Sequence, residues 1–564
     1  MGTLDWVVIG IFFLALIGII VWVVKQKQND SADYFLGGRD ATWLAIGASI
    51  FASNIGSEHL IGLAGAGASS GMAMAHWEIQ GWMILILGWV FVPFYSRSMV
   101  YTMPEFLERR YNPQSRTILS VISLISYVLT KVAVTVYAGG LVFQQVFGIK
   151  ELWGIDFFWI AAIGLVVLTA LYTIFGGMKS VLYTSVLQTP ILLLGSLIIL
   201  VLGFKELGGW DEMMSICSAV TVNEYGDTMT QLIRDNNDPN FPWLGALVGS
   251  AIIGFWYWCT DQFIVQRVLS GKNEKEARRG TIFGAYLKLL PVFLFLIPGM
   301  IAFALHQKYI GAGGEGFLPM LANGTANADA AFPTLVAKLL PAGVKGLVVC
   351  GILAALMSSL ASLFNSSAML FTIDFYKKYR PKASEKTLLY VGRVATVVVV
   401  VLGILWIPVM KSVGSVLYNY LQDVQSVLAP GIAAAFLLGI CSKKATPKGG
   451  MWGLIAGFII GITRLGAKVY YTSGATFSDS WFKYLFYDTN WLFFCGGMLL
   501  FCMLVIVVVS RFTTPAPAEQ IVGLTFGSTT DEQKAVTRAS WNKWDVIHSA
   551  IIILITVVFY WYFW

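Results

Sequence analysis

The sequence predicts an all-α protein that crosses a membrane many times, and three observations lead to this fold class. Of the 564 residues, 57% are hydrophobic and only 12% are charged, compared with roughly 25% charged in soluble proteins. Mean hydropathy is +0.72, and apolar runs near the roughly 20 residues that a membrane-crossing helix needs recur along the chain. These runs are long and unbroken, whereas a β-barrel would show short alternating segments.

Apolar runs separated by polar breaks predict about fourteen spans. The first run, residues 4–25, is too long for the core of a secretion signal and has no cleavage site after it, so we interpret it as a retained span. The polar segment 512–544 is expected to be a cytoplasmic linker before the last span. The expected span centres lie near residues 15, 55, 87, 130, 165, 192, 255, 293, 360, 398, 427, 460, 500 and 554.

Lys and Arg residues gather in alternate loops, and this pattern predicts the orientation of the chain. The loop 204–242 carries only Lys205 and Arg234. Because cytoplasmic loops are enriched in Lys and Arg, we expect the rich loops inside and, with an even number of spans, both termini outside. The same pattern explains the net charge of +7 without a nucleic-acid partner. The rich loops are 97–116, 267–279, 377–386 and 443–448.

Two predicted spans are interrupted by polar residues at their centres. The second span carries Asn54 and Gly56 in its middle, and a later span carries Thr260 and Asp261. Paired broken helices in two halves of a chain indicate a binding site between inverted repeats. Unwound backbone at membrane depth is tolerated only where protein buries it or where it lines a cavity.

Small polar residues follow one face of the span centred near residue 360. Ser358, Ser362, Asn365 and Ser366 have the spacing of a single helix face. For any one serine, close helix packing is an equally good explanation. For Ser358 and Ser359 together, opposite an interrupted helix, we favour a cation site, because hydroxyls and freed carbonyls supply the oxygen ligands that sodium prefers.

A second polar face lies on the span near residue 427. Asn419, Gln422 and Gln425 share this face. Their amides both donate and accept hydrogen bonds, which suits a ligand with many hydroxyl groups. Hydrogen bonding between helices explains each residue alone equally well.

Ionisable residues inside spans are functional candidates by default. Lys288 lies about eight residues into its span, and this depth favours a functional role. Glu78 begins its span and is equally compatible with an interfacial position. Lys131 and Asp261 fit better as partners that neutralise a buried charge.

Aromatic residues and a histidine lie beside the two interruptions. Tyr257 and Trp258 are either core aromatics or residues that stack on, or gate, a ring-shaped ligand. His59 follows the first break and could bond a hydroxyl group, but alone it is a weak signal.

Five stretches of the chain resemble the sodium/glucose cotransporters of the solute:sodium symporter family, and the resemblance covers nearly the whole sequence. It implies a LeuT-type fold with five-plus-five inverted repeats and alternating access. The repeats are then expected at residues 43–205 and 243–440, with peripheral spans over 4–25 and 449–564 of a single transporter domain. The stretches are GASIFASNIGSEHLIGLAGAGASSG, TALYTIFGGMKSVLYTSVLQT, FWYWCTDQFIVQRVLSGKN, GAYLKLLPVFLFLIPGM and LMSSLASLFNSSAMLFTIDFY.

The resemblance also implies the binding residues. The expected sodium ligands are the carbonyls of Ala52, Ile55 and Ala355 and the hydroxyls of Ser358 and Ser359. The expected sugar-binding residues are Asn54, His59, Glu78, Tyr257, Trp258, Lys288 and Gln422. The expected inner gate is Tyr257, and the expected outer gate is Leu63, Trp77 and Tyr418.

Three positions depart from the family pattern. Ser185 stands where many members have an aspartate, which argues against a second sodium site. Gln425 replaces a threonine, and Asn419 replaces an aspartate, of the animal glucose carriers. Sugar selectivity is therefore expected to differ from theirs.

The function implied is symport of sodium with a glucose- or galactose-like hexose across a plasma or bacterial inner membrane. Inositol or another polyol is the alternative cargo, and a sugar sensor without net transport is a further alternative. A channel would need a continuous polar pore. An enzyme would need a nucleophile–base pair or a metal cluster, and four histidines without ligand spacing and six scattered cysteines do not supply one.

Overall fold

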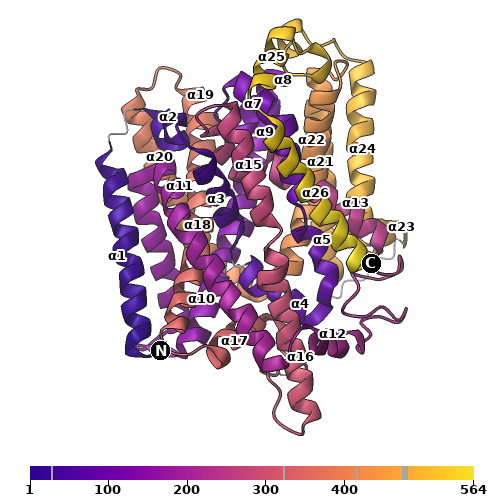
Figure 1. Cartoon of the computed structure of the whole chain (residues 1–564). Helices are drawn as coiled ribbons and strands as arrows, with labels where there is room; N and C mark the ends of the chain where they lie inside the picture. Colours follow the sequence, from indigo (N-terminus) through magenta and orange to yellow (C-terminus); the bar gives the residue numbers. More distant parts are fainter. Residues whose placement is uncertain (27–29, 57, 322–323, 414–416, 473–479) are drawn as a thin grey trace.

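The computed structural model is mostly helical, as the sequence predicts (Figure 1). Within its described part, the one sheet is a two-stranded antiparallel hairpin of β1 (Glu151–Leu152) and β2 (Ile155–Asp156). The structure describes residues 1–26, 30–56, 58–321, 324–413, 417–472 and 480–564, without the side chains of 129, 130, 145, 409–413, 417–421, 423, 472 and 480.

The helical elements follow one another in four groups. The first group is α1 (Thr3–Lys25), α2 (Ser31–Leu36), η1 (Gly37–Arg39), α3 (Trp43–Asn54), η2 (Glu58–Leu63), α4 (Ala64–Ser70), η3 (Gly71–Met74), α5 (Ala75–Glu78), α6 (Gly81–Ile86), η4 (Leu87–Phe91) and α7 (Val92–Ser98). The second is α8 (Met103–Arg110), α9 (Pro113–Ser126), η5 (Tyr127–Val132), α10 (Ala133–Phe147), α11 (Phe157–Leu207) and α12 (Trp210–Ser218). The third is α13 (Trp243–Phe255), η6 (Trp256–Thr260), α14 (Gln262–Leu269), α15 (Glu274–Lys288), η7 (Val292–Leu296), α16 (Ile297–Gly311), η8 (Ala328–Ala330) and α17 (Ala331–Leu339). The fourth is α18 (Val344–Met369), η9 (Leu370–Tyr376), α19 (Lys377–Tyr379), α20 (Glu385–Val413), α21 (Leu417–Cys441), α22 (Pro447–Thr472), α23 (Ser480–Lys483), η10 (Tyr484–Asp488), α24 (Trp491–Arg511), η11 (Ala518–Gln520), η12 (Phe526–Ser528), α25 (Asp531–Ala539) and α26 (Lys543–Tyr562).

The number of spans is lower when continuous helices are counted. In the described part, eleven helices are long and apolar enough to cross a membrane. The 51-residue helix α11 contains two of the expected span centres, those near residues 165 and 192. The stretch Glu58–Ser98 contains one, near residue 87. Two further apolar helices, Trp43–Asn54 and Ala133–Gln144, are shorter. The figure of fourteen spans therefore stays a prediction.

Gly177 separates the two expected spans within α11. Its φ of +54° lies in the left-handed region that favours glycine. A Cβ atom at this position would clash with the backbone carbonyl of Tyr34 in α2. The kink in α11 therefore depends on a residue without a side chain.

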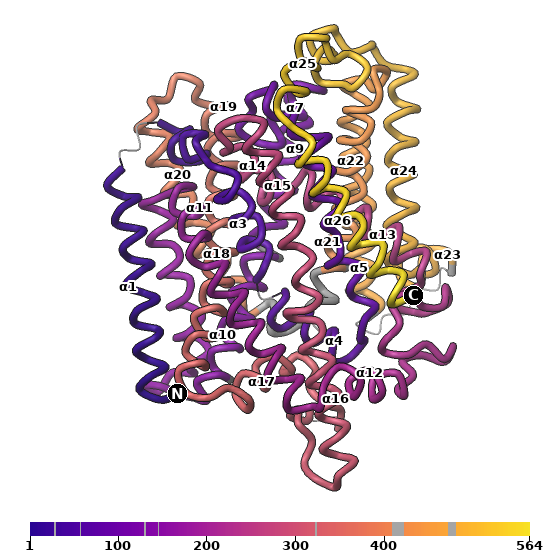
Figure 2. The backbone as a smooth tube through the Cα atoms, viewed as in Figure 1, coloured from indigo at the N-terminus to yellow at the C-terminus, as the bar shows by residue number. Residues whose placement is uncertain are grey.

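The helices divide into a buried centre and a periphery. In the most apolar window of Val344–Tyr379, which contains α18, 94% of the residues are buried, compared with 22% in that of α1. Helix α18 packs against α11 and α3, and α3 packs against α15. Figure 2 shows α1 and α24 on opposite flanks of this bundle. The apolar faces of the peripheral helices are therefore left for lipid.

The two expected classes of loop lie at opposite ends of the bundle. Figure 1 places α7, α8 and α19 at its upper end and α12 and α17 at its lower end. Three arginines counted as loop residues, Arg110, Arg267 and Arg278, are fully buried, so their placement in loops was wrong. Arg110, for example, donates to the carbonyl of Gly439 (2.6 Å) in α21. A charged side chain at the edge of an apolar run is therefore not always exposed to solvent.

The predicted linker 512–544 is packed against the helix bundle. It contains the short helix α25, and Thr537 in this helix accepts a hydrogen bond from Arg97 of α7 (2.8 Å). Ser540 donates to Glu274 at the start of α15 (3.1 Å). These contacts connect the last span α26 to the third and first groups of helices.

Helices α4 and α16 approach each other closely through glycine. A Cβ atom on Gly299 of α16 would clash with the backbone carbonyl of Ala64, and one on Gly67 of α4 would clash with that of Leu296. Helix pairs in membranes use small residues in this way to bring their backbones together. Helix α4 follows the first predicted break, so this contact holds the half of the broken helix that comes after the break.

We predict that Gly299→Ala lowers the melting temperature of the purified protein, because the added methyl group forces α16 away from α4. Gly164→Ala is the matched control, since a Cβ atom at Gly164 of α11 meets nothing within 4 Å. In this control, replacing glycine by alanine should stabilise the helix by about 1 kcal/mol, because alanine has the higher helix propensity. Equal melting temperatures for the two variants would show that the close approach of α4 and α16 is unimportant.

Candidate functional site

The first interruption lies between α3 and η2. Helix α3 ends at Asn54, and Ile55 adopts an extended conformation (φ −77°, ψ 108°). The helix restarts with the amide of His59 bonded to the carbonyl of Gly56 (3.1 Å). A Cβ atom on Gly56 would lie 2.8 Å from the hydroxyl of Ser359, so α18 packs directly onto the break. The predicted interruption at Asn54 and Gly56 is confirmed.

The second interruption lies between η6 and α14. Asp261 is extended (φ −77°, ψ 126°), and its carboxylate caps α14 by accepting from the amide of Phe263 (3.2 Å). The amide of Asp261 donates to the carbonyl of Trp256 (2.9 Å), which ends the π-helical turn η6. Both predicted broken helices are therefore present, and α14 packs against α3.

A buried hydrogen-bond chain connects four of the predicted sugar-binding residues. Lys288 donates to Oε2 of Glu78 (2.6 Å), and the same oxygen lies 3.1 Å from Nε2 of His59. Nδ2 of Asn54 lies 3.3 Å from the same histidine nitrogen. These residues come from α3, η2, α5 and α15, so four elements converge on one place. The Lys288–Glu78 ion pair makes the burial of both charges tolerable.

The histidine at the centre of this chain cannot satisfy both neighbours at once. A single ring nitrogen in neutral imidazole either donates or accepts a hydrogen bond. Nε2 of His59 therefore donates to Glu78 or accepts from Asn54, and its Nδ1 has no partner among the described residues. The chain accordingly keeps unused hydrogen-bonding capacity for a polar ligand.

Two aromatic rings lie beside this chain. The ammonium of Lys288 is 5.3 Å from the ring centroid of Trp258. The rings of Trp258 and Tyr257 are in edge-to-face contact, with centroids 4.9 Å apart. Six of the seven predicted sugar-binding residues are thus connected by contacts that the structure describes.

The seventh residue, Gln422, is buried in α21. Its side chain is 5% exposed, and its carbonyl oxygen has no hydrogen-bond partner among the described residues. An unpaired buried acceptor costs about 1–3 kcal/mol, so a ligand donor at this oxygen would be favourable. Helix α21 contacts both η2 and η6, the elements that carry His59 and Tyr257.

The predicted outer-gate residues are only partly described. Leu63 is fully buried at the end of η2. Trp77 stacks on Trp491 of α24 with ring centroids 5.5 Å apart. Tyr418 belongs to α21, but its side chain lies outside the described residues.

The hydroxyl of Ser359 reaches the first break from α18. Its single proton can be donated to the backbone carbonyl of Ser53 (2.8 Å) or of Ile55 (3.1 Å), both of which are within hydrogen-bond distance. Two of the predicted sodium ligands, the Ile55 carbonyl and the Ser359 hydroxyl, are therefore adjacent. Ala52 and Ala355 are buried on the same two helices, α3 and α18, which pack together.

The other predicted sodium ligand, Ser358, belongs to a separate group of hydroxyls. Its Oγ lies 3.3 Å from Oγ of Ser185 in α11, and Ser185 also lies 3.5 Å from Ser49 of α3. Ser185 donates to the carbonyl of Val181 (2.6 Å) in its own helix. The residue that departs from the family pattern therefore contacts a predicted ligand.

Further along α18, the polar face acts in helix packing. Ser362 is hydrogen-bonded to the hydroxyl of Ser53 in α3 (2.7 Å). Ser366 donates to Gln266 of α14 (2.7 Å). These two serines support the packing explanation for this part of the face.

A second buried ion pair, with a third member, lies at the second interruption. Lys131 and Asp261, expected to be partners of buried charges, pair with each other (2.6 Å). The hydroxyl of Tyr127 also donates to Asp261 and was not singled out. Tyr127 lies one helical turn before Lys131 and hence on the same face, but a tyrosine inside an apolar run gives no signal by itself.

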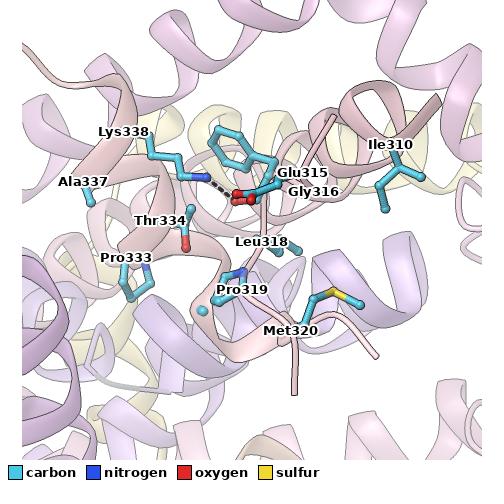
Figure 3. Close-up of a pocket in the computed structure, with 12 residues that line it drawn as sticks. Ile310, Glu315, Gly316, Leu318, Pro319, Met320, Pro333, Thr334, Ala337 and Lys338 are labelled. Carbon is cyan, nitrogen blue, oxygen red and sulfur yellow. Dashed lines mark hydrogen bonds between the residues drawn. The ribbon is translucent and has the colours of Figure 1, made fainter. Parts of the chain in front are cut away.

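The structure contains a cavity of about 780 Å³ (Figure 3). It is formed by residues between Ile310 and Lys338, and Lys338 crosses it to donate to the carbonyl of Phe317 (2.8 Å). None of the predicted site residues lines it. The cavity therefore does not mark the site built above.

A known protein family matches most of the chain. The model of the sodium:solute symporter family matches residues 34–457. The chain belongs to this family. The resemblance noted in the sequence is therefore confirmed, and members of the sodium:solute symporter family are transporters rather than enzymes.

Relatives within the sodium:solute symporter family align along most of their length. Sodium/glucose cotransporter 1 of Ovis aries is 38% identical over 530 residues, which cover 91% of this chain and 79% of that protein. Sodium/glucose cotransporter 4 of Mus musculus is 38% identical over 538 residues, covering 93% and 78%. Sodium/myo-inositol cotransporter 2 of Homo sapiens is 37% identical over 536 residues, again covering 93% and 78%.

A solved structure confirms the fold. A sodium-coupled sialic acid symporter in a substrate-bound outward-open state superposes with a TM-score of 0.72 and 22% sequence identity. The match covers 92% of this chain and 99% of that protein. The expected LeuT-type, multi-span helical fold with broken helices is thus confirmed.

Proposed function

We propose that this protein is a secondary active symporter that couples inward sodium movement to uptake of a hexose sugar by alternating access. The observation that carries the proposal is the Asn54–His59–Glu78–Lys288 chain at the junction of two broken helices. Its members offer both hydrogen-bond donors and acceptors. The relatives named sodium/glucose cotransporters support the choice of sodium and a sugar.

In this proposal, hydrogen bonds to the sugar replace hydrogen bonds that side chains of the protein make with one another. A ligand hydroxyl replaces one of the two contacts at His59 and pairs with the unpaired carbonyl of Gln422. Tyr257 and Trp258 offer ring faces to the apolar faces of a pyranose. A hydroxyl-poor ligand would leave buried polar groups unpaired, and such sites discriminate strongly against it.

The proposed sodium site is formed by oxygens of α3 and α18. Sodium would bind to the Ser359 hydroxyl and the Ile55 carbonyl, which lie 3.1 Å apart, and would replace the hydrogen bond between them. The carbonyls of Ala52 and Ala355 and the hydroxyl of Ser358 complete the proposed set. Neutral oxygens alone can hold a monovalent cation, as carbonyl rings do in ion channels.

The proposed gates lie on either side of the sugar. Tyr257 closes the site toward the Lys- and Arg-rich end, which we propose to be cytoplasmic. Leu63, Trp77 and Tyr418 are the proposed outer gate. Both termini then lie outside a plasma or bacterial inner membrane, and residues 43–205 and 243–440 form the two inverted repeats.

A polyol such as myo-inositol is the second candidate substrate. The observation that favours it is the 37% identity to sodium/myo-inositol cotransporter 2, nearly equal to that of the glucose carriers. Inositol has the ring size and hydroxyl density of a hexose, so the same donors and acceptors would serve. Uptake of labelled glucose, galactose and inositol compared in one preparation separates the two.

One prediction from the proposed function tests the symport and its stoichiometry together. Proteoliposomes with an inward sodium gradient should accumulate sugar, with reversal potentials that correspond to one sodium ion per sugar, because Ser185 replaces the carboxylate of a second site. About 100 mV supplies roughly 2.3 kcal/mol per sodium ion, and a tenfold gradient adds about 1.4 kcal/mol. Accumulation without a sodium gradient contradicts the proposed symport, and a ratio near two contradicts the argument from Ser185.

A second prediction concerns the cation. Ser359→Ala should raise the sodium concentration for half-maximal uptake about ten- to a hundredfold, since a lost bond to a charged group costs roughly 1.5–3 kcal/mol. Ser362→Ala is the matched control, because its hydroxyl bonds to the Ser53 side chain one turn further along α18. An equal sodium dependence in the two variants would move the cation away from Ser359.

A third prediction concerns sugar recognition. Gln422→Ala should weaken sugar binding by about 1–3 kcal/mol, roughly ten- to a hundredfold, with little change in melting temperature. Gln80→Ala is the control, because Gln80 connects α5–α6 to the carbonyl of Ser250 in α13 (2.8 Å) and should mainly affect stability. If Gln422→Ala instead melts early and binds sugar normally, Gln422 only holds helices together.

A further inference from the structure

A buried carboxylate and two buried cations lie around the neighbouring rings of Tyr257 and Phe263. The ammonium of Lys131 lies 4.6 Å from the ring centroid of Tyr257 and an equal 4.6 Å from that of Phe263. It donates to Oδ2 of Asp261 (2.6 Å). The other carboxylate oxygen accepts from the hydroxyl of Tyr127 and from the amide of Phe263. Asp261 thereby fixes Lys131 against Tyr257.

The second cation, Arg267, has no such partner. Its side chain is 0% exposed in α14, and none of its three guanidinium nitrogens has a hydrogen-bond partner among the described residues. The guanidinium lies 5.1 Å from the ring centroid of Phe263, the same ring that Lys131 contacts. A buried cation without a hydrogen-bonded anion is unfavourable by several kcal/mol. This conformation therefore satisfies Lys131 and leaves Arg267 unsatisfied.

The backbone at Asp261 gives the carboxylate a way to reach either cation. Asp261 is the extended residue at the second helix break, between η6, which carries Tyr257, and α14, which carries Arg267. Hinges are residues at the ends of elements that absorb changes in φ and ψ. A rotation here moves the Asp261 carboxylate, the Tyr257 ring and the Arg267 guanidinium relative to Lys131, which belongs to the separate element η5.

We propose that Asp261 is a two-position charge switch: it pairs with Lys131 while Tyr257 is held closed, and with Arg267 when the hinge turns and Tyr257 is released. The inference rests on the proposed role of Tyr257 as the inner gate. At low dielectric each ion pair is strong, and one carboxylate cannot fully satisfy two separate cations. The two arrangements are therefore discrete alternatives rather than a continuum.

The proposal gives the two cations opposite roles. Lys131→Met removes the partner of the closed state, so the gate should open more often. Arg267→Gln removes the partner of the open state, so the gate should stay closed. A static clamp would instead make both variants less ordered around the hinge.

Hydrogen–deuterium exchange of the full-length protein, purified with sodium, tests the switch through the peptides that cover Tyr257–Leu269. Exchange should rise in Lys131→Met and fall in Arg267→Gln, each by about five- to a hundredfold, the usual range of coupling between two states. In proteoliposomes, Arg267→Gln should reduce kcat for uptake with little change in sugar KM. Arg267→Lys retains the charge and should restore part of kcat.

Arg278→Gln is the matched control, because Arg278 is equally buried but pairs with Glu274 (2.7 Å) in α15, away from Tyr257. It should lower the melting temperature without shifting exchange at Tyr257–Leu269. Exchange that changes in the same direction in the Lys131 and Arg267 variants, or in neither, overturns the switch. Hydrogen–deuterium exchange is measured without sugar, so it tests the switch independently of transport. A wild-type protein that fails to transport sugar refutes the proposed function. The opposite changes in exchange in Lys131→Met and Arg267→Gln still test the switch.

Discussion

The structure depends on one constraint, the need to satisfy backbone polar groups where two helices are interrupted inside the membrane. Without water, each unpaired amide or carbonyl at such a break costs several kcal/mol. Ser359 meets this need at the first break through the carbonyls of Ser53 and Ile55, and the Asp261 carboxylate meets it at the second through the amide of Phe263. At the first break, the side chain that satisfies the backbone is thus also a proposed sodium ligand, and at the second it is the carboxylate of a buried ion pair.

The same constraint explains how charges are arranged around the breaks. Glu78 pairs with Lys288, and Asp261 pairs with Lys131, so neither carboxylate is buried alone. Each pair joins elements that are distant in sequence, and a rearrangement of one element must break or exchange a strong contact. Such contacts favour a few discrete states, which is the property that alternating access needs.

The sequence predicted the helices and their breaks well, because hydropathy and centrally placed polar residues are local signals. It also indicated that Lys131, Asp261, Glu78 and Lys288 have a functional or structural role, because burying any ionisable side chain in a membrane span costs free energy. It did not predict that Glu78 meets Lys288, because residues 210 positions apart are brought together only by packing. Arg267 was wrongly assigned to a loop for the same reason: its run of apolar residues ends nearby, yet neighbouring helices cover it completely.

In the proposed mechanism, coupling between the two cargoes follows from the shared backbone of the first break. Ile55, whose carbonyl is a proposed sodium ligand, directly follows Asn54, a proposed sugar ligand, and His59 lies four residues later. Fixing the Ile55 carbonyl on a cation would order the short segment of Asn54 and Ile55 at the end of α3. The entropy of ordering that segment, about 1–2 kcal/mol for each residue, is then already spent when sugar arrives. Sodium therefore raises sugar affinity without touching the sugar, and by thermodynamic reciprocity sugar raises sodium affinity by the same factor.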